Sequence, residues 1–168
     1  MKWIGISGSW RATNKQVEQD VRLNVKKIIK RGDGILTGGA LNVDSFALDE
    51  ALKHDSKAEK IKVFIPTILI LYAAHYRKRA KEGIISSKQA ENLISQLSKL
   101  KEVNPKALIE NRENTKLNKK TYYQRDSEVI KNSDELFAFQ VNDSAGTQDT
   151  INKAEQNGIP VKLFSYSI

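Results

Sequence analysis

Short apolar segments of strand length alternate with helical segments along this chain. The segments 3–8, 35–37 and 61–65 are rich in Ile and Val and are followed by turn residues or proline, which is typical of buried strands. Apolar residues at helical spacing fill 14–31 and 43–53 between them. This alternation predicts an α/β fold, in which a parallel sheet carries helices on both faces and right-handed crossovers join its strands.

The last third of the chain returns to the same order. The pattern predicts a helix over 122–131, a strand over 135–140, a helix over 147–157 and a last strand over 161–164. Gly158 is placed to end the second of these helices, because glycine is favoured just after a helix C-terminus.

The middle of the chain interrupts this order. We expect a basic, mostly helical insertion at about 67–120, with an amphipathic helix over 84–100 and a mobile loop over 111–120. Twelve Lys or Arg stand against five Glu between 76 and 120, so this segment carries most of the net charge of +8. Such a field attracts phosphates, including those of nucleic acid, although a lysine-rich helix is as often only a solvated face. The apolar side of the amphipathic helix is compatible with a homodimer or with an intramolecular contact.

Length and composition exclude several classes of protein. A chain of 168 residues is expected to form a single domain over 1–168. Cysteine is absent, which excludes disulfides and thiolate sites, and two histidines are too few for a His-rich metal site, so no metal is expected. The longest apolar run, 68–74, is far too short to span a membrane, and no signal-peptide pattern precedes the first strand. We expect a cytoplasmic protein with no membrane partner and no required cofactor.

Small residues follow three of the predicted strands. Gly8 ends the first strand, Gly38 and Gly39 follow the second, and Gly146 lies in the turn before the helix over 147–157. In a parallel sheet such turns meet beyond the C-terminal ends of the strands, where ligands bind. Backbone N–H groups in these turns, at the positive end of a helix, favour a phosphate or another anion. Together the turns predict a nucleotide site.

Polar residues beside these turns have two interpretations each. Ser9 and Arg11 are suited to a phosphate, or they simply complete a tight strand exit. Asp44 accepts hydrogen bonds from ribose hydroxyls, or it interacts with the dipole of its own helix. Arg125 reaches over the site toward a ligand or forms a surface salt bridge, and Thr147 faces an anion or only caps its helix.

The order of these motifs resembles a Rossmann-like superfamily that joins DNA-processing protein A to the LOG-type, lysine-decarboxylase-like phosphoribohydrolases. The motifs are Gly-Ser-x-Arg after the first strand, Thr-Gly-Gly-Ala-x-x-x-Asp after the second, an Arg-Asp helix, and Ser-x-Gly-Thr-x-x-Thr before the last helix. The resemblance covers 1–65 and 121–164 but not the basic middle. It implies a Rossmann-like doubly wound parallel sheet with a nucleotide or phosphoribosyl pocket. The residues that it places in the pocket are Gly8, Ser9, Arg11, Gly38, Gly39, Asp44, Arg125, Ser144, Gly146 and Thr147.

One departure from the family pattern bears on catalysis. LOG-type hydrolases carry Pro-Gly-Gly-x-Gly-Thr-x-x-Glu, and their Glu is implicated in cleaving the N-glycosidic bond of a nucleoside monophosphate. Thr150 stands at that position here, and Asp149 should point about 100° away on the helix. The Ser-x-Gly-Thr form is more similar to the DNA-processing branch, whose members bind single-stranded DNA.

We therefore expect a domain that binds a nucleotide or a nucleotide-derived phosphate without LOG-type hydrolysis, and we assign no catalytic residue. Two alternatives stay open at this point. One is a single-stranded DNA-binding protein that uses the basic middle segment. The other is a nucleoside monophosphate phosphoribohydrolase with a rearranged set of carboxylates.

Overall fold

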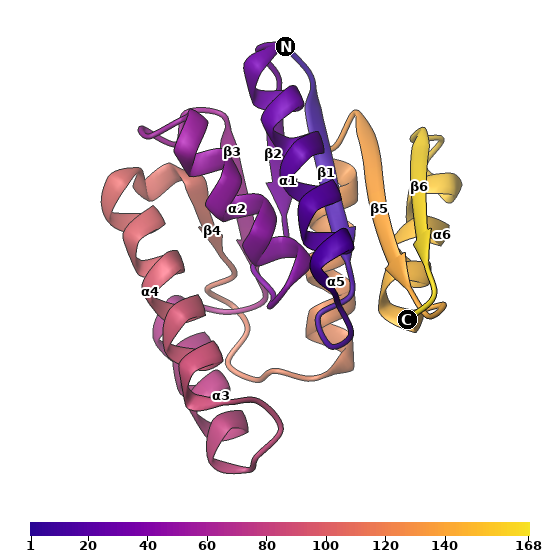
Figure 1. The fold of residues 1–168 in the computed structure, drawn as a ribbon. Coiled ribbons are helices and arrows are strands. Elements are labelled where there is room, and N and C mark those ends of the chain that lie inside the picture. Colours follow the sequence, from indigo (N-terminus) through magenta and orange to yellow (C-terminus); the bar gives the residue numbers. More distant parts are fainter.

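The alternation predicted from the sequence is confirmed in the computed structural model, which describes residues 1–168 (Figure 1). The strands are β1 (Trp3–Gly8), β2 (Gly34–Thr37), β3 (Ile61–Ile65), β4 (Leu108–Glu110), β5 (Glu135–Val141) and β6 (Val161–Tyr166). The helices are α1 (Lys15–Lys30), α2 (Val43–His54), α3 (Leu69–Lys81), α4 (Ser87–Val103), α5 (Lys119–Lys131) and α6 (Ala145–Gln156), with a short 3-10 turn at Pro105–Ala107.

All six strands are parallel and lie in the order β4-β3-β2-β1-β5-β6. From β1 the chain builds outward through β2 and β3 to β4, and α5 then carries it back to β5 on the other side of β1. This reversal of direction makes the sheet doubly wound, as predicted. In such sheets the crevice beyond the C-terminal ends of the two strands at the reversal, here β1 and β5, is the usual ligand site.

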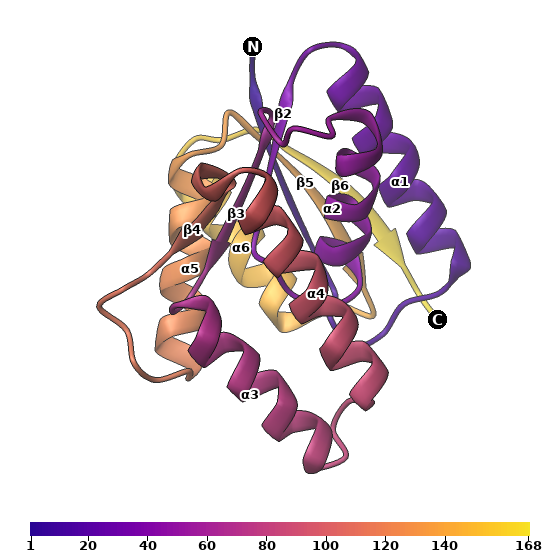
Figure 2. The ribbon, with the colours of Figure 1, turned by 90° about the vertical axis from the view of Figure 1, so that its left-hand side faces the viewer.

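Helices cover both faces of the sheet. Figure 2 shows α1, α2 and α4 on one face and α5 and α6 on the other. In both views α3 lies past the C-terminal ends of the strands, and it packs against α4. None of the helices combines the length and apolar character that crossing a membrane requires.

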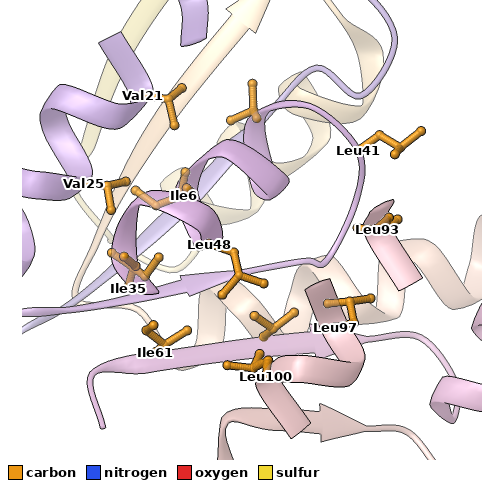
Figure 3. Packing of buried hydrophobic residues seen from close by; sticks show 14 of the residues in the cluster. Ile6, Val21, Val25, Ile35, Leu41, Leu48, Ile61, Leu93, Leu97 and Leu100 are labelled. Carbon is orange, nitrogen blue, oxygen red and sulfur yellow. The ribbon is translucent and has the colours of Figure 1, made fainter. Parts of the chain in front are cut away.

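The main core lies between the sheet and α1, α2 and α4. Strand residues and helix residues meet there in one buried apolar cluster. Figure 3 shows members from three strands and three helices: Ile6, Ile35, Ile61, Val21, Val25, Leu48, Leu93, Leu97 and Leu100. Because α4 supplies several of these side chains, the middle of the chain is part of the same core as the rest of the sheet.

The middle segment also adds a strand that the sequence analysis did not predict. β4 is only three residues long and pairs in parallel with β3, with Leu108 beside Val63 and Glu110 beside Ile65. Three residues are too few to show the period of a strand, and pairing with β3 decides their conformation. The predicted mobile loop is fastened at Asn114, whose side chain donates to the Pro66 carbonyl oxygen at 2.9 Å.

Leu97 provides a test of this packing. Its side chain is fully buried on α4, so Leu97→Ala should lower the free energy of unfolding by about 2–5 kcal/mol in urea denaturation. Leu23→Ala on α1 is the matched control, because Leu23 is 51% exposed and its truncation should change stability by no more than about 0.5 kcal/mol. Equal effects of the two variants would contradict the packing of α4 described above.

Candidate functional site

Three turns meet where the chain reverses direction in the sheet. Gly8 is the last residue of β1, Gly38 directly follows β2, and Ser144 lies between β5 and α6. β1 is hydrogen-bonded to both β2 and β5, so all three turns lie at one edge of three adjacent strands. The grouping predicted from the sequence therefore exists in space.

An inner pocket of about 100 Å³ lies between these turns. It is lined by Ile6, Ser7, Gly8, Trp10, Gly38, Ala40, Asp44, Arg125, Asp126, Val129, Ser144, Gly146, Thr147 and Thr150. Seven of the ten residues named from the sequence are in this set. This small volume suits a compact group such as a phosphoryl group better than a whole nucleoside.

The other three named residues lie elsewhere. Arg11 lines a second pocket that adjoins the first. Ser9 is buried and lines neither pocket, and its hydroxyl accepts a hydrogen bond from the N–H of Ala12 at 3.1 Å, so it completes the turn after β1. Gly39 also lines neither pocket; a side chain there would meet Ile65 and Val63 in the core. Its φ of +68° is the left-handed conformation that favours glycine.

Arg125 fixes the geometry of the inner pocket. Its side chain is 10% exposed, Nε donates to Asp126 at 2.8 Å, and Nη1 donates to the carbonyl oxygen of Gly38. Burial alone would lower the pKa of Arg125, but the charges of Asp126 and Asp44 together with Tyr72 hold it above its ordinary value. Arg125 therefore stays charged, and two carboxylates already compensate that charge.

Asp44 is the second carboxylate of the pocket. It lies in the first turn of α2, is 7% exposed, and accepts a hydrogen bond from the N–H of Ala40 at 3.1 Å. Burial raises the pKa of Asp44 above its usual range, and the attraction of Arg125 and the Ala40 N–H offsets only part of that effect. A carboxylate held in this way is suited to accept hydrogen bonds from a hydroxyl group of a ligand.

The N-terminus of α6 opens onto the same pocket. No side chain caps this helix, and the N–H groups of Gly146 and Thr147 form no hydrogen bond. By contrast, Asn14, Ser86 and Asn118 cap α1, α4 and α5 with their side chains. Free N–H groups at the positive end of a helix attract an anion. They supply the positive potential that Arg125, already paired with carboxylates, does not.

A larger outer pocket of about 540 Å³ adjoins the inner one. Its lining residues are Trp10, Arg11, Ala40, His75, Tyr76, Arg79, Ile84, Ile85, Lys119, Tyr122, Tyr123, Arg125, Asp126 and Gly146. Trp10, Ala40, Arg125, Asp126 and Gly146 border both pockets, so the two lie side by side. The walls of the outer pocket come from the loop after β1 and from α3 and α5.

Aromatic rings and charged side chains make up most of the lining of this outer pocket. Burial and the neighbouring Tyr76 raise the pKa of Tyr122, so its hydroxyl stays protonated. Burial lowers the pKa of His75, as do the charges of Arg79 and Lys78, so its ring is neutral near pH 7. Flat rings beside cationic side chains are the groups on which a nucleobase stacks.

Sequence reasoning missed several residues of the outer pocket as members of the site. Trp10, Arg79 and Lys119 were not predicted to line it, and Asp126 was named only in the Arg-Asp motif and among the carboxylates of the alternative hydrolase. Asn42 places Trp10 here, since its side chain donates to the Trp10 carbonyl oxygen at 2.5 Å and ties the loop after β1 to the start of α2. Arg79 and Lys119 belong to the basic segment 76–120, which was expected to attract phosphates but was not expected to meet the three turns.

Thr150 and Asp149 are the two α6 residues that were compared with the glutamate of LOG-type hydrolases. Thr150 lines the inner pocket, and its hydroxyl donates to the Gly146 carbonyl oxygen at 3.2 Å. Asp149 lies outside both pockets and accepts a hydrogen bond from Lys153 at 2.6 Å. The α6 helix therefore brings no acid or base into the pocket, which leaves Asp44 and Asp126 as its carboxylates.

Several solved structures have a fold similar to that of this chain. No family model matches the sequence, and no curated protein does. Among solved structures, DNA processing protein A from Helicobacter pylori superposes with a TM-score of 0.71 at 20% identity, over 96% of this chain and 64% of that one. DNA processing protein A from Streptococcus pneumoniae gives a TM-score of 0.52 at 15% identity, over 96% of this chain and 58% of that one. The chain shares the Rossmann-like fold of these proteins.

A third solved structure widens the comparison. The molybdenum cofactor carrier protein from Chlamydomonas reinhardtii gives a TM-score of 0.52 at 18% identity, over 99% of this chain and 78% of that one. The resemblance inferred from the motifs is thus confirmed at the level of the fold. This chain spans less than two thirds of either DNA processing protein A, so their binding properties do not transfer with the fold.

The pKa of Asp44 gives a test of the electrostatics. Because that pKa is raised in the folded protein, protonation favours folding, and the benefit is complete only below the ordinary value of about 3.8. At neutral pH the buried charge is a net cost. Asp44→Asn should therefore give a melting temperature equal to or above that of the wild type at about pH 7.

The difference in melting temperature between Asp44→Asn and the wild type should shrink as the pH falls toward about 4, because Asp44 of the wild type then becomes neutral as well. Thermal melts followed by circular dichroism at several pH values measure it. A variant that melts well below the wild type at neutral pH would show that ionised Asp44 stabilises the fold.

Proposed function

We propose that this protein binds a nucleotide or a nucleotide-derived phosphate at the C-terminal edge of its sheet. The observation that carries the proposal is the pairing of a phosphate-sized inner pocket with a larger aromatic pocket that opens from it. The two together match the parts of a nucleotide, which has a compact anionic group at one end and a flat base at the other.

The phosphate lies in the inner pocket at the N-terminus of α6. There it accepts hydrogen bonds from the free N–H groups of Gly146 and Thr147. The Thr147 hydroxyl, which here donates to Ser144 Oγ at 3.3 Å, turns to the phosphate as a third donor. The Gly38 turn lies opposite and carries no side chain, because a Cβ there would come within 2.6 Å of Arg125. Arg125 keeps that wall in place.

The sugar and base extend from the inner pocket into the outer one. Asp44 and Asp126 accept hydrogen bonds from sugar hydroxyls, since both carboxylates border the inner pocket and Asp126 also borders the outer one. The base stacks among Trp10, Tyr122 and Tyr123. Thr150 in place of a glutamate supports binding without cleavage of the glycosidic bond.

Thermal shift with a panel of mono-, di- and cyclic nucleotides tests the proposal. We expect at least one of them to raise the melting temperature at millimolar concentration, because a ligand that binds only the folded state stabilises it. The same nucleotide should be recovered without release of free base. A panel with no stabilising nucleotide would refute the proposed function.

Thr147→Val examines the phosphate contact with little change in side-chain shape. Loss of a hydroxyl that binds a charged group should weaken nucleotide affinity about tenfold. Thr13→Val is the matched control: the Thr13 hydroxyl is buried without a hydrogen-bond partner and lies outside both pockets. Isothermal titration calorimetry compares the two variants, and similar affinities would place the phosphate elsewhere.

A second candidate function is binding of single-stranded DNA. The structural study of the Helicobacter pylori protein describes a single-stranded DNA binding mode for that DNA processing protein A. In this chain, Arg11, Arg79 and Lys119 surround an opening lined with aromatic rings, which is a combination that single-stranded nucleic acids favour.

Salt dependence separates this candidate from the first. If the chain binds oligonucleotides through several phosphates, the logarithm of the affinity should fall with the logarithm of the salt concentration, with a slope of about −0.7 for each phosphate contact. Fluorescence anisotropy with a labelled oligonucleotide measures the slope. An oligonucleotide that fails to bind at low salt would remove this candidate.

A further inference from the structure

The outer pocket contains cations that the protein does not neutralise. Arg11, Arg79 and Lys119 all line it, and none of them forms a salt bridge. The single carboxylate of this pocket, Asp126, is already held by Arg125. Three unpaired positive charges therefore face one cavity.

Neutral partners hold these cations at the pocket wall. The Arg11 guanidinium lies 4.5 Å from the centre of the Trp10 ring, and Lys119 Nζ lies 5.3 Å from that of Tyr123. Arg79 Nε donates to the neutral ring of His75 at 3.4 Å. Aromatic and neutral partners orient a cation without cancelling its charge. The side chains are thus arranged to meet an anion that comes from outside the protein.

One phosphate cannot satisfy both pockets. The inner pocket offers free N–H groups, and its volume of about 100 Å³ suits a single phosphoryl group. A phosphate bound there leaves the three cations of the outer pocket facing the sugar and the base, which carry no negative charge.

Building on the proposed function, we infer that the ligand carries two separated phosphates. One is a terminal phosphate at the N-terminus of α6, and the other lies in the outer pocket among Arg11, Arg79 and Lys119, with a nucleoside between the two. Nucleoside bisphosphates and short 5′-phosphorylated dinucleotides share this chemistry. The small volume of the inner pocket favours a terminal phosphate over a diester inside a long strand.

Calorimetry with three series of ligands tests the inference on the full chain. The series are the 5′-monophosphates, the 5′-diphosphates and the 3′,5′-bisphosphates of adenosine, guanosine, cytidine and uridine. With the preferred base, the 3′,5′-bisphosphate should bind about tenfold more tightly than the 5′-monophosphate, because it gains contacts between charged groups. The 3′,5′-bisphosphate should also bind more tightly than the 5′-diphosphate, because the two phosphates of the diphosphate are adjacent and cannot reach both pockets.

Paired variants locate the second phosphate. The double variant Arg79→Gln/Lys119→Gln should remove most of the advantage of the bisphosphate over the monophosphate. Lys78→Gln/Lys120→Gln is the matched control, since Lys78 directly precedes Arg79 on α3 and Lys120 directly follows Lys119 on α5, but both lie outside the two pockets. This control should keep the advantage.

Several outcomes would overturn the inference. Equal affinities for monophosphate and bisphosphate would do so while leaving the proposed function intact, and so would a diphosphate that binds as tightly as the bisphosphate. A single-stranded oligonucleotide without terminal phosphates that binds more tightly than every bisphosphate would favour a strand as the ligand. If none of the twelve nucleotides binds, the inference is overturned; the proposed function fails with it when the cyclic nucleotides of the thermal-shift panel give no stabilisation either.

Discussion

The buried guanidinium of Arg125 is the interaction on which the arrangement of the site depends. It comes from α5, yet it donates to the carbonyl oxygen of Gly38 after β2 and lies beside Asp44 on α2. One side chain thus joins elements from both faces of the sheet at the point where the strand order reverses. A cation in such a place must be paired, and here Asp126 and Asp44 both compensate it. The inner pocket keeps its shape because this pairing leaves little freedom to the walls around it.

Because the charge of Arg125 is compensated, the positive potential that attracts an anion comes from other groups of the site. Because Asp126 and Asp44 compensate its charge, Arg125 mainly holds the wall of the inner pocket in place and attracts an anion only weakly. The free N–H groups of α6 and the unpaired cations of the outer pocket remain available. Three other helices carry side-chain caps. The starts of α2 and α3 also lack a side-chain cap, but the start of α6 lies at the inner pocket, where a ligand can take the place of the missing cap.

Much of the fold could be predicted because its signals are local. Val17, Val21 and Val25 repeat at helical spacing and are all buried on α1, and Asn14 accepts a hydrogen bond from the Val17 N–H as its capping role requires. β4 could not be predicted in the same way, since three residues show no period and only β3 makes them a strand. The start of α5 at Lys119 was also missed, because Asn118 and Thr121 form a capping box within a polar stretch that resembles a loop.

The sequence by itself determined the parallel α/β fold and the three turns at one edge, because glycine, capping residues and apolar spacing act over a few neighbours. The motif comparison also sets Thr150 at the position of the glutamate in LOG-type hydrolases. Only the tertiary structure decided which polar residues meet. Ser9 and Gly39 stabilise the turns after β1 and β2 and do not line either pocket. Trp10, Arg79 and Lys119 come from three separate segments and meet at the outer pocket. Distances between segments depend on the packing of helices against the sheet, which no local pattern encodes.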